Sequence, residues 1–183
     1  MRRLHVGDAV WLDGVVFGVR DGNLIRVFDQ KVTPPCDWNG AALLHTAPNV
    51  RKIGPGKYEP VSVGTTTSMR MDRFTEGLLR DYGVRAILGK GGLSAQSAAL
   101  MRHYGAVYLS VTGGAAAMET LQIEEIENVY WEELMPECIW QIRFKGLGPM
   151  TVGIDTHGGN LQDEIQQRAR DKTAELLRKM GVT

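Results

Sequence analysis

A single short stretch of this sequence, TTTSMRMD at residues 65–72, brings together four hydroxyls, a guanidinium and a carboxylate. The planar guanidinium of Arg70 can hold a carboxylate or a phosphate through two parallel hydrogen bonds. The hydroxyls can bond the same ligand, although one or two of them are expected only to cap the local backbone. Asp72 is expected to cap a helix that begins at Arg73, because its carboxylate can accept hydrogen bonds from the free amides of a first helical turn. For Arg70 alone, a surface salt bridge is the competing interpretation.

A second candidate cation, Lys90, stands in the segment GKGG, whose glycines let the backbone approach a ligand closely. The spacing does not match a nucleotide phosphate loop. Five residues separate Gly83 from Gly89 where that loop has four, and Gly91 follows the lysine where the loop has serine or threonine. The turn Thr112-Gly113-Gly114 is a third candidate site, and a simple tight connection is its competing interpretation.

Each of these turns follows a strand-like run and precedes a segment with helical periodicity. The three units are YEPVSV before GTTTSMRMD, VRAIL before GKGG, and AVYLSV before TGG. Strands that alternate with helices predict βαβ units, a parallel sheet and right-handed crossovers. The three turns would then lie along the carboxyl edge of the sheet, where α/β proteins bind ligands and where helix N-termini favour anions.

The rest of the chain is predicted to be β-rich at its start and helical at its end. Short β segments are expected from Gly7 to about Val63, where turn residues such as the Pro34-Pro35 pair argue against helices. Two more strands are expected at CIWQIRF and PMTVGID. A final helix from Leu161 to Met180 carries one apolar face, which would pack on this domain or on a partner. We therefore predict one α/β domain over residues 1–183, with 161–183 as a C-terminal helical extension.

The composition excludes several classes of protein. Lys+Arg and Asp+Glu both number 21, so the chain lacks the global basic charge expected of a nucleic-acid or anionic-membrane binder. No apolar run is long enough to span a membrane and no signal peptide is recognisable, so a cytoplasmic protein is expected. Cys36 and Cys138 have no metal-ligand spacing, and two thiols cannot hold an iron–sulfur cluster alone. The four histidines form no zinc or triad pattern: His5, His45, His103 and His157.

Five segments, taken in order, resemble the iron–sulfur-dependent class I fumarases and L(+)-tartrate dehydratases. They are TTTSMRMD, AILGKGG, GAVYLSVTGGAAA, VYWEELMPECIWQIRF and GIDTHGG. The likeness runs roughly from Val6 to Asn160 and is to the separate β subunit, equivalent to the C-terminal domain of the single-chain enzymes. It implies a swivelling β/β/α-type domain. It also implies a hydro-lyase that reversibly hydrates or dehydrates a short dicarboxylate such as fumarate, malate or tartrate.

The resemblance also implies roles for individual side chains. The substrate-binding cations and the candidate catalytic base would be Arg20, Arg70, Lys90 and, as the base, Thr66. Without the resemblance, Arg20 and Asp21 read as an ordinary exposed pair before a turn at Gly22-Asn23. Three fixed cations suit a substrate with two carboxylates and a transition state that gains negative charge. Thr66 is the weaker assignment, because a free hydroxyl is far too weakly acidic to ionise unless nearby cations stabilise the alkoxide.

In this family a [4Fe–4S] cluster is bound by the α subunit and acts as a Lewis acid on the substrate hydroxyl. The resemblance therefore implies an α-subunit partner, no metal ligands in this chain, and no activity without that partner. Homodimerisation is left open, and no nucleic-acid or membrane partner is expected. The alternative is a stand-alone module that binds a dicarboxylate or another anion without catalysis. A third hypothesis is a scaffold in which Arg70 and Lys90 form only ion pairs.

Overall fold

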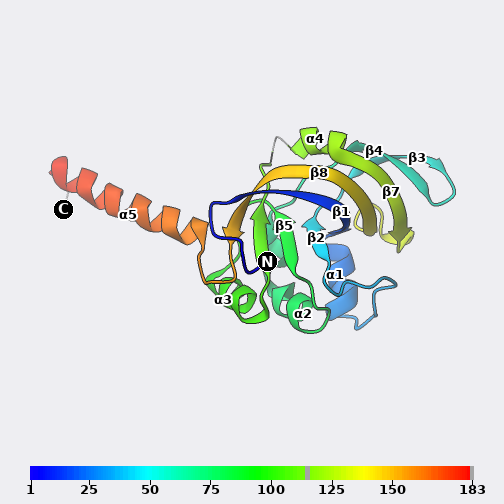
Figure 1. Ribbon diagram of the computed structural model, residues 1–183, viewed down its shortest axis with the longest axis horizontal. Coiled ribbons are helices and arrows are strands. Elements are labelled where there is room, and N and C mark those ends of the chain that lie inside the picture. Colours follow the sequence, from blue (N-terminus) through cyan, green and yellow to red (C-terminus); the bar gives the residue numbers. More distant parts are fainter. Residues whose placement is uncertain (114–115, 182–183) are drawn as a thin grey trace.

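The computed structural model describes residues 1–113 and 116–181 and contains one mixed sheet with helices packed beneath it (Figure 1). The sheet has the strand order β1-β2-β5-β6-β8-β7. Its strands are β1 (Ala9–Val19), β2 (Ala42–His45), β5 (Ala86–Gly89), β6 (Val107–Ser110), β7 (Ile123–Tyr130) and β8 (Ile139–Ile154). The first four strands pair in parallel, and β8 is antiparallel to its neighbours. The predicted α/β class is confirmed.

The long strand β8 closes this sheet into a ring. It pairs with β1 along most of its length and with β6 through its last residues. Alternate residues of the short parallel strands therefore face two different apolar clusters. Leu44, Leu88 and Leu109 belong to one cluster, which also takes residues of β8 and β7. Leu43, Ile87 and Tyr108 belong to the other, which is shared with the helices.

Three short helices cover that second cluster on one side of the sheet: α1 (Asp21–Phe28), α2 (Thr75–Arg80) and α3 (Ala95–Tyr104). Each lies between successive parallel strands in the chain, as the predicted βαβ units require. The start of α3 is fixed by Ser94, whose hydroxyl accepts a hydrogen bond from the Ser97 amide at 3.2 Å. Its end is fixed by Gly105 in the left-handed conformation. The carboxyl edge of the parallel strands, where ligand binding was predicted, thus lies at the N-terminal ends of these helices.

Helix α1 was not predicted, because Gly22-Asn23 was interpreted as a turn. In the structure these residues form the first turn of the helix. The Asn23 side chain is fully buried, and its Oδ1 accepts a hydrogen bond from the Arg20 amide at 3.2 Å while its Nδ2 donates to the Glu137 carbonyl at 3.0 Å. A residue that sequence reasoning reads as a turn former is here held in a helix by contacts with a distant segment.

The strand predicted to precede the hydroxyl-rich stretch does not join the parallel sheet. Residues of β4 (Lys57–Ser62) instead pair antiparallel with β3 (Asn49–Gly54) in a separate two-stranded sheet. The connection is the dipeptide Pro55-Gly56, and Gly56 has φ +64°. A two-residue loop with a positive φ favours a hairpin, so this local turn outcompetes the parallel pairing.

Two pairs of predicted β segments each form one strand. DAVWLDG and VVFGV lie together in β1, and CIWQIRF and PMTVGID lie together in β8. The acidic stretch before β8 also contributes β7, which was not predicted. Shorter elements complete the chain: the 3₁₀ helices η1 (Ser68–Phe74), η2 (Thr120–Gln122) and η3 (Glu132–Leu134), and helix α4 (Ala116–Glu119). In the third predicted turn, Gly114 lies outside the described residues.

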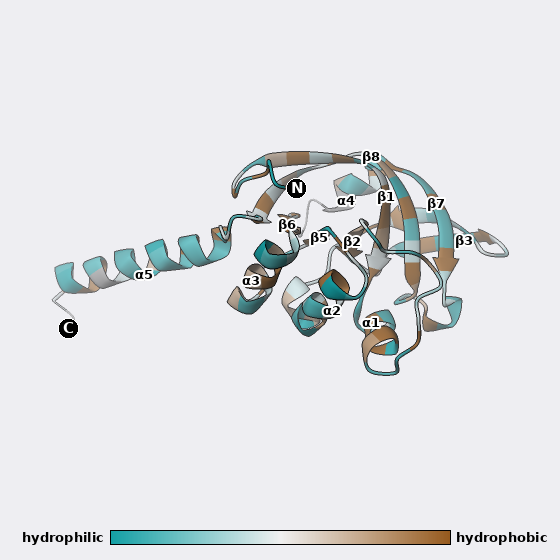
Figure 2. Cartoon of the chain, turned by 60° about the horizontal axis from the view of Figure 1, so that its bottom comes forward, coloured by the Kyte–Doolittle hydropathy of each residue, from teal (hydrophilic) through white to brown (hydrophobic). Residues whose placement is uncertain are grey.

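The C-terminal helix α5 (Leu161–Lys179) matches its predicted bounds to within one residue and projects away from the body of the molecule (Figures 1 and 2). Asn160 begins it, because its Oδ1 accepts the Gln162 amide at 3.1 Å. Ile165, Leu176 and Met180 are exposed. The described side chains of the helix beyond Leu161 are exposed, and packing on this domain or on a partner stays a prediction. None of the described helices combines the length and apolar character needed to cross a membrane.

Candidate active site

The hydroxyl-rich stretch lies on the carboxyl edge of the parallel strands, although the strand before it does not belong to the sheet. The Thr66 amide donates to the His45 carbonyl at the end of β2 at 2.8 Å. The Ser68 amide donates to the Lys90 carbonyl just after β5 at 3.0 Å, and Thr67 forms a parallel bridge with Lys90. The backbone contacts therefore bring Thr66 and Lys90 to neighbouring positions on one edge.

Arg20 and Arg70, which are 50 positions apart in the sequence, share one carboxylate at this edge. Asp21 Oδ2 lies 2.7 Å from Arg70 Nη2 and 3.5 Å from Arg20 Nε. Glu137 Oε1 lies 3.3 Å from Arg20 Nε, and Glu137 Oε2 accepts the Gly22 amide at 2.6 Å. Arg20 is thus anchored between two carboxylates, whereas the Arg70 side chain remains 52% exposed. The open donors of Arg70 point to a surface that an added anion can reach.

Lys90 follows the last residue of β5 and is partly buried. Its side chain lies over Gly113, where an added Cβ would stand 3.3 Å from Lys90 Cδ and 3.8 Å from Lys90 Nζ. Within the part of the chain that the structure describes, Lys90 makes no salt bridge. Arg20 and Arg70 have carboxylates nearby, so Lys90 supplies the uncompensated positive charge of this edge.

Asp72 was predicted to cap a helix that begins at Arg73, and this prediction is wrong. Residues on both sides of it are in η1, and α2 begins later, at Thr75. The Asp72 carboxylate instead accepts hydrogen bonds from the Ser94 amide at 2.9 Å, the Ser94 hydroxyl at 2.7 Å and the Ser97 hydroxyl at 2.7 Å. Asp72 therefore ties η1 to the start of α3, and its role is structural.

Sequence reasoning missed a buried polar cluster directly beneath the hydroxyl-rich stretch. His45 Nδ1 lies 3.0 Å from Ser68 Oγ, and the Tyr108 hydroxyl donates to Ser68 Oγ at 2.9 Å. Burial lowers the pKa of His45 to about 4 and raises the pKa of Tyr108 to about 12, so both groups are neutral at pH 7. Neither the spacing of the histidines nor any local motif marks this cluster.

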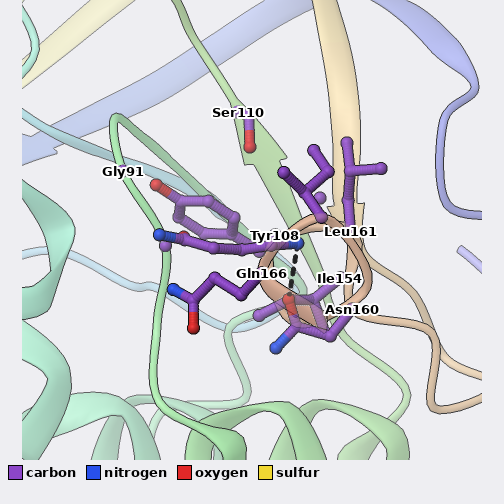
Figure 3. Close-up of a pocket in the computed structure, with 11 residues that line it drawn as sticks. Gly91, Tyr108, Ser110, Ile154, Asn160, Leu161 and Gln166 are labelled. Atoms are coloured by element: carbon purple, nitrogen blue, oxygen red, sulfur yellow. Dashed lines mark hydrogen bonds between the residues drawn. The ribbon is translucent and has the colours of Figure 1, made fainter. Parts of the chain in front are cut away.

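A cavity of about 350 Å³ opens beside the GKGG turn, between β6 and the start of α5 (Figure 3). Its polar lining is uncharged: it includes the Tyr108 ring, Ser110, Asn160 and the amide side chains of Gln162 and Gln166. A dicarboxylate needs fixed cations, which this lining does not supply. The cavity is therefore separate from the arginine pair, although Gly91 joins it to the turn that carries Lys90.

The side chains of this chain do not fit an iron–sulfur cluster. Burial raises the pKa of the Cys36 thiol to about 11 and that of the Cys138 thiol to about 12, whereas cluster ligands are thiolates. Over residues 1–113 and 116–181, no group of three or more His, Cys, Asp or Glu side chains could hold a metal ion. What these residues offer is a set of cations and hydroxyls.

The sequence of this chain matches a known family. The sequence model of the Fumarase C-terminus family covers residues 1–165, and the chain belongs to that family of hydro-lyase domains and subunits. It is 41% identical over 162 residues to "L(+)-tartrate dehydratase subunit beta" of Escherichia coli (strain K12), which covers 88% of this chain and 80% of the relative. It is 32% identical over 182 residues to "Putative L(+)-tartrate dehydratase subunit beta" of Methanocaldococcus jannaschii, over 97% of this chain and 93% of the relative.

A third relative is considerably longer than this chain. It is "Putative fumarate hydratase class I" of Geobacillus stearothermophilus, 32% identical over 177 residues, which are 96% of this chain and 34% of that protein. The resemblance inferred from the motifs is thereby confirmed at the level of the family. The roles inferred for Arg20, Thr66, Arg70 and Lys90 stay predictions.

Proposed function

We propose that this chain is the β subunit of a two-subunit hydro-lyase that adds water to, or removes it from, a short dicarboxylate such as tartrate, malate or fumarate. One observation carries the proposal: Arg20 and Arg70, from distant segments, meet at Asp21 on the same edge as Lys90. The names of the relatives, which are tartrate dehydratase β subunits and a fumarate hydratase, support the class of reaction and the need for an α subunit.

In this proposal the two arginines bind one substrate carboxylate. Arg70 has exposed donors and offers a planar fork to a carboxylate. Arg20 is held by Glu137 and supplies the second guanidinium. The substrate carboxylate shares Arg70 with Asp21 or displaces Asp21 from it. Lys90 serves the second carboxylate, because its ammonium has no counter-ion within the described residues.

Removal of a proton from the carbon beside a carboxylate places more negative charge on that carboxylate. Fixed cations stabilise this charge more in the transition state than in the bound substrate, which is the condition for catalysis. Thr66 stands at the same edge, anchored through its amide to the end of β2. We assign it to the substrate-lining surface and, as the weaker part of the proposal, to proton transfer at its Oγ1.

In this proposal the α subunit binds the [4Fe–4S] cluster, which would supply Lewis acidity at the substrate hydroxyl. The cysteines of this chain support that assignment, because both are protonated and one is buried in the core. The contribution of this chain is then to bind and orient the substrate and to stabilise the charge that develops on it.

Anaerobic reconstitution tests the proposal. The isolated chain should show no hydratase or dehydratase activity towards L-tartrate, malate or fumarate, and turnover should appear when an α subunit with an intact cluster is added. A matched mixture with cluster-free α subunit is the control. The stand-alone binding module predicts the opposite pattern: calorimetry would detect dicarboxylate binding to the isolated chain, and no partner would produce turnover. Turnover by the isolated, metal-free chain would also contradict the proposal.

A further inference from the structure

Three buried polar side chains meet beneath the proposed substrate edge. His45 ends β2, Ser68 begins η1 and Tyr108 lies in β6, and their exposed fractions are 1%, 0% and 1%. The Ser68 hydroxyl is the centre of the cluster, 3.0 Å from His45 Nδ1 and 2.9 Å from the Tyr108 hydroxyl. A single hydroxyl on the hydroxyl-rich stretch is thus bonded to two strands of the sheet.

The backbone of Ser68 makes a further link to the sheet. Its amide donates to the Lys90 carbonyl at 3.0 Å, so Ser68 is bonded to the last residue of β2, to the residue after β5 and to Tyr108 within β6. Ser68 stands two positions after Thr66 and two positions before Arg70. The contacts of this one residue therefore fix the middle of the turn between Thr66 and Arg70, in addition to the bond of the Thr66 amide to the His45 carbonyl and the pairing of Arg70 with Asp21.

The sheet leaves space for this arrangement at Gly89. A Cβ at Gly89 would stand 2.0 Å from Ser68 Oγ and 3.3 Å from the Tyr108 hydroxyl oxygen. The Ser68 side chain therefore occupies the volume that any other residue at position 89 would fill. This contact seats the stretch directly on the sheet backbone.

The protons of the cluster have a consistent order. The Tyr108 hydroxyl donates to Ser68 Oγ, and the Ser68 hydroxyl can then donate to His45 Nδ1, which is an acceptor in one tautomer of the neutral imidazole. In that tautomer the imidazole proton is on Nε2, which is buried and has no hydrogen-bond partner among the described residues. Apolar side chains would fill this volume without the desolvation cost of polar groups, so the cluster is better explained by the geometry that it specifies than by stability.

We propose that the His45–Ser68–Tyr108 cluster is a positioning device that holds Thr66 and Arg70 at a fixed place relative to Lys90. The inference rests on the proposed function, because it concerns how that substrate edge is held. The three residues do not touch the substrate. They act through the turn that Ser68 anchors.

The test uses Tyr108→Phe and Ser68→Ala in the reconstituted complex. Each removes one hydroxyl from the cluster, and each should lower kcat/KM about threefold to tenfold, with changes in both kcat and KM. Tyr82→Phe is the control for a tyrosine hydroxyl, since Tyr82 lies away from the cluster against Phe28 and Trp38. Thr75→Val is the control for a buried hydroxyl, since Thr75 Oγ1 has no hydrogen-bond partner. Both controls should keep kcat/KM within twofold.

A structural defect alone would lower activity in any background, so the positioning role needs a second readout. In an Arg70→Met background, Ser68→Ala should lower kcat/KM by clearly less than it does in the wild type, because part of its effect passes through Arg70. Equal losses in both backgrounds, or losses no larger than those of the controls, would overturn the inference.

A third readout separates this inference from the proposed function. In the isolated chain, Tyr108→Phe should move the NMR amide signals of Thr66 and Arg70 more than Tyr82→Phe does. If the wild-type complex has no turnover, the proposed function fails and these signals still decide the geometry. Signals that stay unchanged in Tyr108→Phe overturn the positioning role whatever the activity.

Discussion

The carboxyl edge of the sheet and the C-terminal helix α5 are built in opposite ways. At the edge, a stretch of a few residues is bonded to the end of β2, to the residue after β5 and to Tyr108 within β6, and Arg20 is held by carboxylates from two segments. Helix α5 leaves the body after its first turns (Figure 1), and its apolar side chains Leu176 and Leu177 are exposed.

This difference distinguishes a region that is held by contacts within the chain from a helix whose apolar side chains the chain itself leaves exposed. The edge is organised by contacts within the chain, so its geometry is present before any ligand arrives. The family model ends at residue 165, soon after α5 begins, whereas the relatives from Methanocaldococcus jannaschii and Geobacillus stearothermophilus align over 97% and 96% of this chain.

The largest effect is expected for Arg70→Met in the reconstituted complex. Loss of a cation that meets a substrate carboxylate should cost about 2 to 5 kcal/mol, which lowers kcat/KM by a factor between about 30 and several thousand. Arg73→Met is the matched control, because Arg73 lies in the same 3₁₀ helix and pairs with Asp29 at the surface. Steady-state kinetics measures kcat/KM for both variants. Equal losses in the two would contradict the role of Arg70 in binding a substrate carboxylate.

Acid stability should depend on His45. Because burial lowers its pKa from 6.5 to about 4, the unfolded chain takes up a proton as the pH falls through 6.5 and the folded chain does so only near pH 4. The free energy of unfolding should therefore fall by about 2 to 3 kcal/mol between pH 6.5 and pH 4 from this group. Urea unfolding should show that contribution lost in His45→Gln and kept in His103→Gln. If the wild type, His45→Gln and His103→Gln lost the same stability in acid, the protonation of His45 would not be the cause of that loss.

Gly89→Ala should destabilise the isolated chain by about 1 to 3 kcal/mol, because the new methyl group collides with the Ser68 hydroxyl. Gly54→Ala is the control, since an added Cβ there would meet only the Lys57 side chain, at 3.8 Å or more. The midpoint of urea unfolding measures both. If the two substitutions cost the same, the stretch is not seated on the sheet as described.

Asp21→Asn should tighten the binding of tartrate or sulfate to the reconstituted complex by about threefold to tenfold. The substitution removes a negative charge that competes for Arg70, while Glu137 still anchors Arg20. Asp29→Asn makes the same change beside Arg73 and should leave anion affinity unchanged. Calorimetry would sharpen the comparison, and weaker binding by Asp21→Asn would mean that Asp21 organises the arginines rather than competing with the ligand.

The smallest effect is expected for removal of residues 167–183. Most side chains of α5 are exposed, so the free energy of unfolding of the isolated chain should change by less than about 0.5 kcal/mol. Leu44→Ala, in a cluster within the sheet, should cost about 2 to 5 kcal/mol and provides the contrast. A truncation that costs as much as Leu44→Ala would show that α5 belongs to the core fold.

Much of the fold could be predicted because its signals are local. The runs VRAIL and AVYLSV alternate with helical segments, and the structure contains the parallel strands β5 and β6 that they indicated. The end helix was placed to within one residue by its capping and apolar pattern. Helix α1 and the β3–β4 hairpin were missed, since Asn23 takes its helical place from contacts with Glu137 and Cys138. The β3–β4 hairpin was missed because the two-residue turn at Pro55-Gly56 pairs β4 with β3, where the sequence had predicted a strand of the parallel sheet.

The candidate site divides in the same way. The residue types at Arg70 and Lys90 and their place in turns could be read from the sequence, and the family likeness added Arg20 and Thr66. The carboxylates could not be assigned as partners of the arginines, because that requires the folded positions of segments that are 49 residues apart for Asp21 and Arg70 and 115 residues apart for Gly22 and Glu137. The His45–Ser68–Tyr108 cluster was hidden for the same reason, since its members come from three separate elements.

The central claim is that Arg20 and Arg70 act together on one substrate carboxylate, and a double-variant cycle in the reconstituted complex tests it most directly. We would measure kcat/KM for Arg20→Met, Arg70→Met and the combined variant. The account predicts strong coupling, in which the second substitution costs far less than the first because the carboxylate has already lost its site. Losses that multiply independently, or single variants with wild-type activity, would contradict it.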